Sequence, residues 1–295
     1  MSRYSSNPEL AAMSAMGPDP EKGMSASCNL QVEVHGGIEG APGQDVVAEE
    51  VPVAMVYNGI SHAVMMASPC DLEDFALGFS LTEGIIDSPG QLFHLEVHTV
   101  DEGISIEMHI AGDCFARLRQ QRRNMTGRTG CGLCGTESLA HAVRAIPRVP
   151  NHPLPDDDSV QQALRNLRRY QPLQEKTGAT HAAAWCDNQG RIELVREDVG
   201  RHNALDKLIG ARIRSGGESA FGDGFALVSS RASFEMVQKS ASVGIGCLVA
   251  VSAATALAVR EAKKASMTLI GFARPGRHVI YNRGDRQSSE EREHE

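Results

Sequence analysis

Two cysteines stand three positions apart in the segment Thr129-Gly130-Cys131-Gly132-Leu133-Cys134-Gly135. Glycines flank both cysteines, so the backbone there can adopt positive φ and no bulky side chain shields the sulfur atoms. A reactive sulfur atom of a second molecule can therefore approach them closely. We interpret this segment as a chemically active loop.

The CxxC spacing is compatible with other kinds of site. Half of a structural zinc site would need a second ligand pair, and the chain has no second CxxC, HxH or CxxH. A thioredoxin-like disulfide motif begins a helix, which the glycines disfavour, although Thr136 could cap a helix over residues 139–146. Chance pairing of two cysteines stays open as well.

The stretch before the cysteines is basic. Positive charge near a thiol favours the thiolate, the form that attacks sulfur electrophiles and carries a persulfide. The alternative is a solvated basic helix face, although no acidic residues alternate with the arginines to form the usual helical pairs. The arginines are Arg117, Arg119, Arg122, Arg123 and Arg128.

Base deaminases also use a CxxC pair, with H-x-E upstream of P-C-x-x-C. His94-Leu95-Glu96 precedes Cys131, but Gly130 stands where that pattern has proline. His94 also lies in a strand-like alternation, whereas the catalytic element would be expected at the start of a helix. A zinc-dependent deaminase is therefore kept as an alternative only.

A second polar set follows three apolar, strand-like runs. It comprises Ser229-Ser230-Arg231, Ser252 and the segment Phe272-Ala273-Arg274-Pro275-Gly276-Arg277. Ligands of open parallel α/β sheets gather at the carboxyl ends of strands, so we expect these groups to converge on one crevice. Ser233 can cap a helix whose free N–H groups face an anion, and Arg274 and Arg277 suit phosphate. The alternative is an ordinary turn with two surface arginines.

A third polar cluster is Glu197-Asp198-Val199-Gly200-Arg201-His202-Asn203, again where a strand passes into a helix. His202 could act as an acid or base near neutral pH. A lone histidine at a helix start also serves as a capping or packing group, so both roles stay open.

The C-terminal half reads as alternating buried elements. Residues 225–229, 247–251 and 267–272 are continuous apolar runs typical of buried strands, and residues 233–243 and 254–265 have helical spacing. This order predicts parallel strands with helical crossovers, hence an α/β domain. A strand over 191–196, a helix over 203–213 and a helix near 159–170 are also expected.

The N-terminal half predicts an α+β module. Strands are expected over residues 46–57 and 61–67, joined by a tight hairpin at Asn58-Gly59. A helix over 72–81 and strands over 92–100 and 104–110 follow. The joint to the next domain is placed in residues 117–135.

Composition excludes several classes of protein. The chain has 295 residues, 29 basic against 37 acidic, and a net charge of −8, which gives no overall reason to bind nucleic acid or a membrane surface. Its seven cysteines are mostly scattered singly, so they form a poor disulfide framework and indicate a reducing, cytoplasmic setting. Residues 1–27 resemble a disordered leader rather than a signal peptide, and residues 240–259 are too rich in Gly and Ser for a membrane span.

Taken together, these residues resemble the FdhD/NarQ family of formate dehydrogenase accessory sulfurtransferases. The resemblance runs from about residue 46 to about residue 283, in the expected order. The matching segments are Asp74-Phe75-Ala76-Leu77-Gly78-Phe79, Thr82-Glu83-Gly84-Ile85-Ile86, Gly130-Cys131-Gly132-Leu133-Cys134-Gly135, Glu197-Asp198-Val199-Gly200-Arg201-His202-Asn203-Ala204, Ser229-Ser230-Arg231 and Gly271-Phe272-Ala273-Arg274-Pro275-Gly276-Arg277.

The resemblance implies a cytidine-deaminase-like three-layer α/β/α domain with a smaller N-terminal α+β domain, as a homodimer. On this basis we expect a leader at 1–27, an α+β domain at 28–127, the α/β domain with the CxxC loop at 128–285, and a frayed tail at 286–295. No nucleic-acid or membrane partner is expected.

The resemblance also implies the activity. A cysteine desulfurase would load sulfur onto the protein, which would pass it to a molybdenum or tungsten bis-molybdopterin guanine dinucleotide cofactor destined for formate dehydrogenase. Cys131 would carry the persulfide, Cys134 would help, and Phe272, Ala273, Arg274, Pro275, Gly276 and Arg277 would bind the cofactor. No metal and no permanently bound cofactor is expected. A non-catalytic chaperone that holds the molybdenum cofactor is the other alternative.

Overall fold

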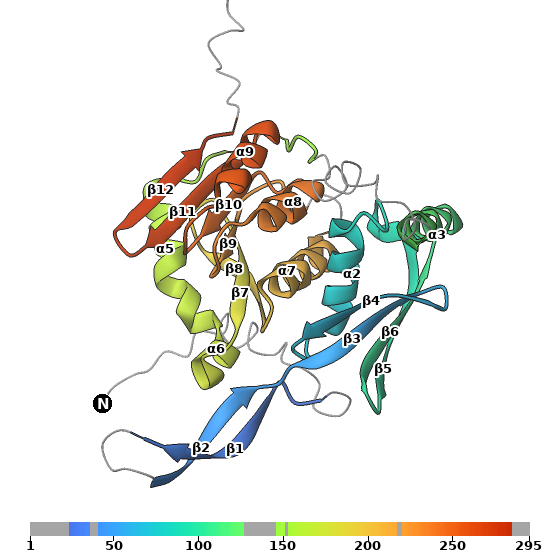
Figure 1. The fold of residues 1–295 in the computed structure, drawn as a ribbon. Helices are drawn as coiled ribbons and strands as arrows, with labels where there is room; N and C mark the ends of the chain where they lie inside the picture. The colour runs from blue at the N-terminus through green and yellow to red at the C-terminus, as the bar shows by residue number, and fades with distance from the viewer. Residues whose placement is uncertain (1–23, 36–40, 127–145, 151–152, 217–219, 285–295) are drawn as a thin grey trace, which may run out of the picture.

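The computed structural model describes residues 24–35, 41–126, 146–150, 153–216 and 220–284 (Figure 1). Within these residues the strands form three sheets: a two-stranded hairpin, a four-stranded sheet and a six-stranded sheet. None of the described helices is both long and apolar enough to cross a membrane. Residues 240–259, which were checked for this from the sequence, instead contain the end of one helix, a strand and the start of another helix.

The four-stranded sheet has the order β4-β3-β6-β5. Its strands are β3 (Val51–Tyr57), β4 (Ile60–Ala67), β5 (Leu92–Val100) and β6 (Gly103–Ile110). Along β3 every second side chain is buried, so one face of this sheet forms a core. Asn58 and Gly59 both adopt positive φ between β3 and β4, which confirms the tight hairpin expected there.

Helices α2 (Leu72–Thr82) and α3 (Gly112–Thr126) pack on the buried face of this sheet. The helix expected over 72–81 is therefore confirmed. Part of the basic stretch at 117–135 is also helical, since α3 runs to Thr126.

A separate antiparallel hairpin, β1 (Ser27–Val34) with β2 (Ala41–Ala48), precedes this sheet. It was not predicted, and it divides the single strand expected over residues 46–57. β2 ends at Ala48 and β3 begins at Val51, because the two strands belong to different sheets.

The six-stranded sheet has the order β12-β11-β10-β9-β7-β8. Its strands are β7 (His181–Cys186), β8 (Ile192–Asp198), β9 (Phe225–Val228), β10 (Cys247–Ala250), β11 (Thr268–Arg274) and β12 (Arg277–Asn282). β9, β10 and β11 are parallel, as the order of apolar runs and helices predicted. β7, β8 and β12 are antiparallel to their neighbours, and β7 and β12 were not predicted.

Helices cover both faces of this sheet. α7 (Arg201–Gly216), α8 (Phe234–Ser242) and α9 (Ala256–Lys264) share one core with it, and α5 (Asp157–Leu167) shares a second core with the opposite face. The short helix α6 (Pro172–Thr177) follows α5. This part of the chain is thus a three-layer α/β/α arrangement (Figure 1).

The two larger units meet where α2 lies against α7 (Figure 1). Glycine makes this contact possible on both helices. A Cβ atom on Gly78 would lie 1.8 Å from the carbonyl oxygen of Asp206, and one on Gly210 would lie 1.9 Å from that of Asp74. The two backbones touch at these points, and no residue with a side chain fits there.

Candidate functional site

The segments that follow β9 and β10 and the last part of β11 are joined through their backbones. Ser252 N–H donates to the carbonyl of Ser230 at 3.2 Å, and Phe272 N–H donates to the carbonyl of Ser252 at 2.9 Å. Ala232 and Ala254 form a parallel bridge beside them. The three strand ends therefore meet at one edge of the sheet, as expected for parallel strands, and the crevice expected there stays a prediction.

Two helices begin at this edge. α8 starts after Ser233 and α9 after Thr255, whose hydroxyl caps the helix by accepting a hydrogen bond from Ala258 N–H. Ser233 occupies the N-cap position with extended backbone, but its side chain makes no capping hydrogen bond. The free N–H groups of two helix starts favour negative charge at this edge.

Arg274 and Arg277 are paired across the hairpin between β11 and β12. Both are exposed, and within the described residues neither forms an ion pair. In the turn between them, Gly276 N–H donates to Gln161 Oε1 of α5 at 2.7 Å. The turn is thus held by α5 while the two guanidinium groups face solvent.

Phe272 and Ala273 differ in what they can contact. Ala273 is fully buried in the core shared with α5, so its side chain is closed to a ligand. Phe272 adopts φ 47°, which is rare for a bulky residue, and the residue is 38% exposed. The backbone irregularity between Gly271 and Arg274 turns the Phe272 ring outward instead of into the core.

Cys131 and Cys134 lie outside the described residues, as do Arg128 and the side chains of Arg122 and Arg123. The described chain stops at Thr126, the last residue of α3, and resumes at Ile146, which packs against the core of the α/β unit. Their role as sulfur carrier and helper stays a prediction.

The two described arginines of the basic stretch lie on α3. Arg117 pairs with Asp87 at 2.8 Å, and the guanidinium of Arg119 lies 5.9 Å from the centre of the Phe115 ring. For these two residues, the interpretation as an exposed helix face holds.

The five described cysteines are unpaired. Burial raises the pKa of Cys70 to about 11 and that of Cys247 to about 12. Burial also raises the pKa of Cys186 well above its usual value, and that of Cys114. These four thiols are therefore poor sources of thiolate near neutral pH.

The third polar cluster is structural for the most part. Asp198 and Lys207 form a fully buried ion pair at 2.7 Å, and Asn203 Nδ2 donates both to Asp198 and to the carbonyl of Met66. Glu197 accepts hydrogen bonds from the two N–H groups that start α6. Lys207 was not identified from the sequence, because nothing in the sequence distinguishes a buried lysine in a helix from an exposed one.

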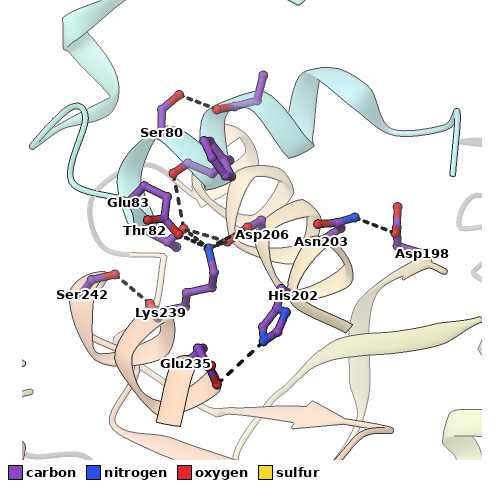
Figure 2. A network of polar contacts seen from close by, with 12 residues as sticks. Ser80, Thr82, Glu83, Asp198, His202, Asn203, Asp206, Glu235, Lys239 and Ser242 are labelled. Carbon is purple, nitrogen blue, oxygen red and sulfur yellow. Dashed lines mark hydrogen bonds and ion pairs between the residues drawn. The ribbon is translucent and has the colours of Figure 1, made fainter. Parts of the chain in front are cut away.

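His202 faces a pocket of about 360 Å³ between α2, α7 and α8 (Figure 2). Burial and, to a smaller extent, the nearby cations Arg201 and Lys239 together lower the pKa of His202 to about 4. The imidazole is therefore neutral near pH 7. This pocket was not anticipated, because its residues come from four separate segments of the chain.

At the base of the pocket, the Lys239 ammonium donates to Thr82, Glu83 and Asp206 at 2.8 to 3.1 Å (Figure 2). Burial alone would lower the pKa of Lys239. The carboxylates of Asp206 and Glu83 together have the larger effect, so the pKa is raised. All protons of the ammonium are used within the protein.

The deaminase-like His94 and Glu96 lie within the largely exposed strand β5 and not at the start of a helix. Both oxygens of Glu96 face histidines of the same strand, His94 at 3.0 Å and His98 at 3.2 Å. Within the described residues there is no group of three or more metal-binding side chains.

Comparison with known proteins gives consistent results. A sequence model of the FdhD/NarQ family matches residues 48–288. The chain is 56% identical over 237 residues to the sulfur carrier protein FdhD of Cupriavidus necator, covering 80% of this chain and 82% of that protein. It is 51% identical over 255 residues to the protein of the same name from Xanthomonas euvesicatoria, covering 86% and 90%.

A solved structure shares the fold. The crystal structure of a protein assigned as a formate dehydrogenase accessory protein from Desulfotalea psychrophila superposes with a TM-score of 0.68, covering 88% of this chain and 97% of that one. At 22% identity this likeness concerns the fold alone.

Proposed function

Because the chain belongs to the FdhD/NarQ family, we propose that it is a sulfur carrier in the maturation of formate dehydrogenase. The observation that carries this proposal is its 56% identity over 237 residues to a relative named a sulfur carrier protein. In the proposal, a cysteine desulfurase supplies the sulfur. A bis-molybdopterin guanine dinucleotide cofactor of molybdenum or tungsten, bound as substrate, receives it.

The loading step is a thiol–persulfide exchange at Cys131. Its thiolate attacks the outer sulfur of the desulfurase persulfide, the new S–S bond forms as the old one breaks, and the desulfurase cysteine leaves as thiolate. No net oxidation takes place. The glycines around Cys131 support this role, since they leave the sulfur open to a second protein.

Cys134 assists delivery. Its thiolate attacks the inner sulfur of the Cys131 persulfide, and the outer sulfur leaves with the electron pair of the broken bond and binds the cofactor metal. A Cys131–Cys134 disulfide remains, and a cellular thiol must reduce it before the next cycle. The chain is then a sulfurtransferase and not a passive holder.

The joined strand ends are the proposed place for the cofactor's phosphates. Arg274 and Arg277 are exposed and lack ion pairs within the described residues, so their charges are available to an anion. The helix starts after Ser233 and Thr255 favour negative charge at the same edge. Phe272 offers an exposed aromatic ring next to them.

Two further features belong to the proposal. The α/β/α layers are those of a cytidine-deaminase-like domain that has kept the architecture without the deaminase reaction. The protein acts as a homodimer in the cytoplasm.

The direct test is mass spectrometry of the full chain after incubation with a cysteine desulfurase and L-cysteine. We expect one added sulfur atom on Cys131, lost in Cys131→Ala. Cys28→Ala is the matched control, and we expect it to keep the adduct. An unmodified wild-type Cys131, or an equal adduct in Cys131→Ala, contradicts the proposal.

The alternatives give different outcomes. A chaperone that only holds the cofactor would support formate dehydrogenase activity equally well with Cys131→Ala. A zinc-dependent deaminase would be purified with one zinc ion per chain, and the zinc would be lost when either Cys131 or Cys134 is replaced.

A further inference from the structure

The pocket beside His202 is negative overall. Three carboxylates line it, Glu83, Asp206 and Glu235, and Lys239 is the one cation among its lining residues. Even with Arg201, the other cation acting on His202, the carboxylates are in excess. A positively charged group is therefore the complementary ligand.

Lys239 neutralises two of the carboxylates, whereas the third, Glu235, is held charged by groups at the start of α8 and forms no ion pair with a lysine or arginine of the described residues. Lys239 pairs with Asp206 at 2.9 Å and with Glu83 at 2.8 Å. The Glu235 side chain is 52% exposed, and its nearest basic neighbour, His202 Nε2, lies 4.0 Å away. Because His202 is neutral near pH 7, it does not cancel the charge of Glu235.

The walls of the pocket suit a long basic side chain. Met65, Phe79 and Phe234 supply apolar and aromatic surface beside the carboxylates. Aromatic faces attract cations, and Lys239 itself already lies 5.4 Å from the centre of the Phe79 ring. The stem of an arginine or lysine side chain can pack on this surface while its charge reaches Glu235.

One wall belongs to an edge strand. Met65 lies on β4, which pairs with β3 and with no other strand of the described chain. Met66 stands opposite Pro52 of β3, which has no N–H and so cannot donate a hydrogen bond to the Met66 carbonyl. That carbonyl accepts a hydrogen bond from Asn203 Nδ2 at 2.8 Å. The backbone groups of Met66 thus point away from β3, and by the alternation of an antiparallel ladder those of Val64 do so too.

The side chains of β4 alternate between the two faces of the sheet. Met65 points to the pocket, while Val64 and Met66 lie on the other face of the sheet and are 61% and 49% exposed. A strand added to this edge would place one side chain beside Met65 and its two neighbours beside Val64 and Met66. The edge therefore suits a segment in which a basic residue stands between two apolar ones.

We propose that β4 accepts an extended segment of a partner protein as an added strand, whose basic side chain enters the pocket and pairs with Glu235. Main-chain hydrogen bonds to Val64 supply affinity, and the pocket supplies specificity for the basic residue. The proposal uses neither Cys131 nor the arginines Arg274 and Arg277, and it shares with the strand-end edge only the start of α8, where Glu235 follows Ser233 by two residues.

The test uses the full chain and a dye-labelled peptide, acetyl-Thr-Val-Arg-Val-Thr-amide, with binding followed by fluorescence anisotropy. We expect saturable binding, weakened about tenfold or more when norleucine replaces the arginine and when the protein carries Glu235→Gln. Glu102→Gln, in the exposed turn between β5 and β6, is the matched control and leaves binding unchanged. Absence of binding, or equal loss in both variants, overturns the proposal.

Backbone pairing is tested on the peptide, so protein folding is not at issue. N-methylation of both valines removes the N–H groups that would face Val64 and Met66, and we expect binding to be lost. N-methylation of the arginine, whose N–H points away from β4, is the control and is tolerated. If L-arginine amide binds as tightly as the peptide, the pocket serves a free amine and the added strand is wrong.

Discussion

Lys239 of α8 places its Nζ 2.9 Å from Asp206 Oδ2 of α7, with 9% and 1% of the two side chains exposed. Thr82 and Glu83, at the end of α2, bind the same ammonium (Figure 2). A single lysine therefore links three helices, and these helices come from both larger units of the fold. The pocket exists because this link holds α2, α7 and α8 together at its base.

Replacing Lys239 by Met should destabilise the protein strongly. The change leaves the carboxylate of Asp206 buried without a cation, and we expect the free energy of unfolding to fall by about 3–5 kcal/mol in chemical denaturation. Lys239→Met combined with Asp206→Leu should recover much of this loss, because the buried carboxylate is then removed too and the remaining one, Glu83, is 33% exposed to water.

The control for Lys239 is Lys264→Met. Lys264 also pairs with a carboxylate, that of Glu261 at 2.7 Å, but its own side chain is 67% exposed. We expect a loss under about 1 kcal/mol there. Equal losses for the two lysines would contradict the importance of burial.

The glycine contact between α2 and α7 gives a second prediction. In Gly78→Ala or Gly210→Ala the new methyl group would collide with a backbone carbonyl, so the helices must separate. We expect each variant to lose at least about 2 kcal/mol of unfolding free energy. Gly112→Ala, whose Cβ would meet nothing within 4 Å, should unfold like the wild type in the same denaturation experiment.

Much of the fold could be predicted from short-range pattern. The parallel strands β9, β10 and β11 are continuous apolar runs, and Asn58-Gly59 marks a hairpin, so both were predicted correctly. β1 and most of β2 were missed because none of their described side chains is fully buried, so the sequence shows no alternation of buried positions. β12 was missed because it is a half-buried edge strand, and the Pro275-Gly276 turn before it was interpreted as a ligand loop or an ordinary surface turn and not as a hairpin.

The candidate sites, like the fold, could be predicted from the sequence only in part. That the strand ends meet follows from topology, so the sequence could place Ser230, Ser252 and Phe272 together. The pocket at Glu235 could not be predicted, since it depends on how α2 packs on α7 through two glycines. No local sequence pattern identifies Gln161 either. Its side chain accepts a hydrogen bond from the N–H of Gly276, 115 positions away in the sequence.

The paired arginines Arg274 and Arg277 lead to a binding prediction. We expect the full chain to bind a guanine nucleoside diphosphate, and Arg274→Ala and Arg277→Ala each to weaken binding about tenfold, through loss of a charge-assisted contact to phosphate. Calorimetric titration measures this directly. Arg260→Ala, an exposed arginine on α9, should bind like the wild type, and equal weakening by all three would contradict the assignment.

Phe272 should show a trade-off between stability and binding. Its φ of 47° costs a bulky residue about 1 kcal/mol, which glycine does not incur. We expect Phe272→Gly to be more stable than Phe272→Ala by about 1 kcal/mol in thermal or chemical unfolding, although both lack the ring. If the ring contacts the nucleotide, both variants should lose the same affinity. Equal stability of the two would mean that the backbone there is unstrained.

His202 predicts how stability depends on pH. Its pKa is about 4 in the folded protein and 6.5 in the unfolded chain, because burial, Arg201 and Lys239 disfavour the charged ring. Between these values the unfolded chain binds a proton that the folded protein does not, so stability falls as pH is lowered from 6.5 towards 4.

The variant His202→Gln removes this contribution to the pH dependence of stability. Between pH 7.5 and 5 we expect the wild type to lose about 2 kcal/mol more unfolding free energy than His202→Gln. His35→Gln, at an exposed position directly after β1, should follow the wild type. Parallel curves for the wild type and His202→Gln would show that the imidazole is as well solvated as in the unfolded chain.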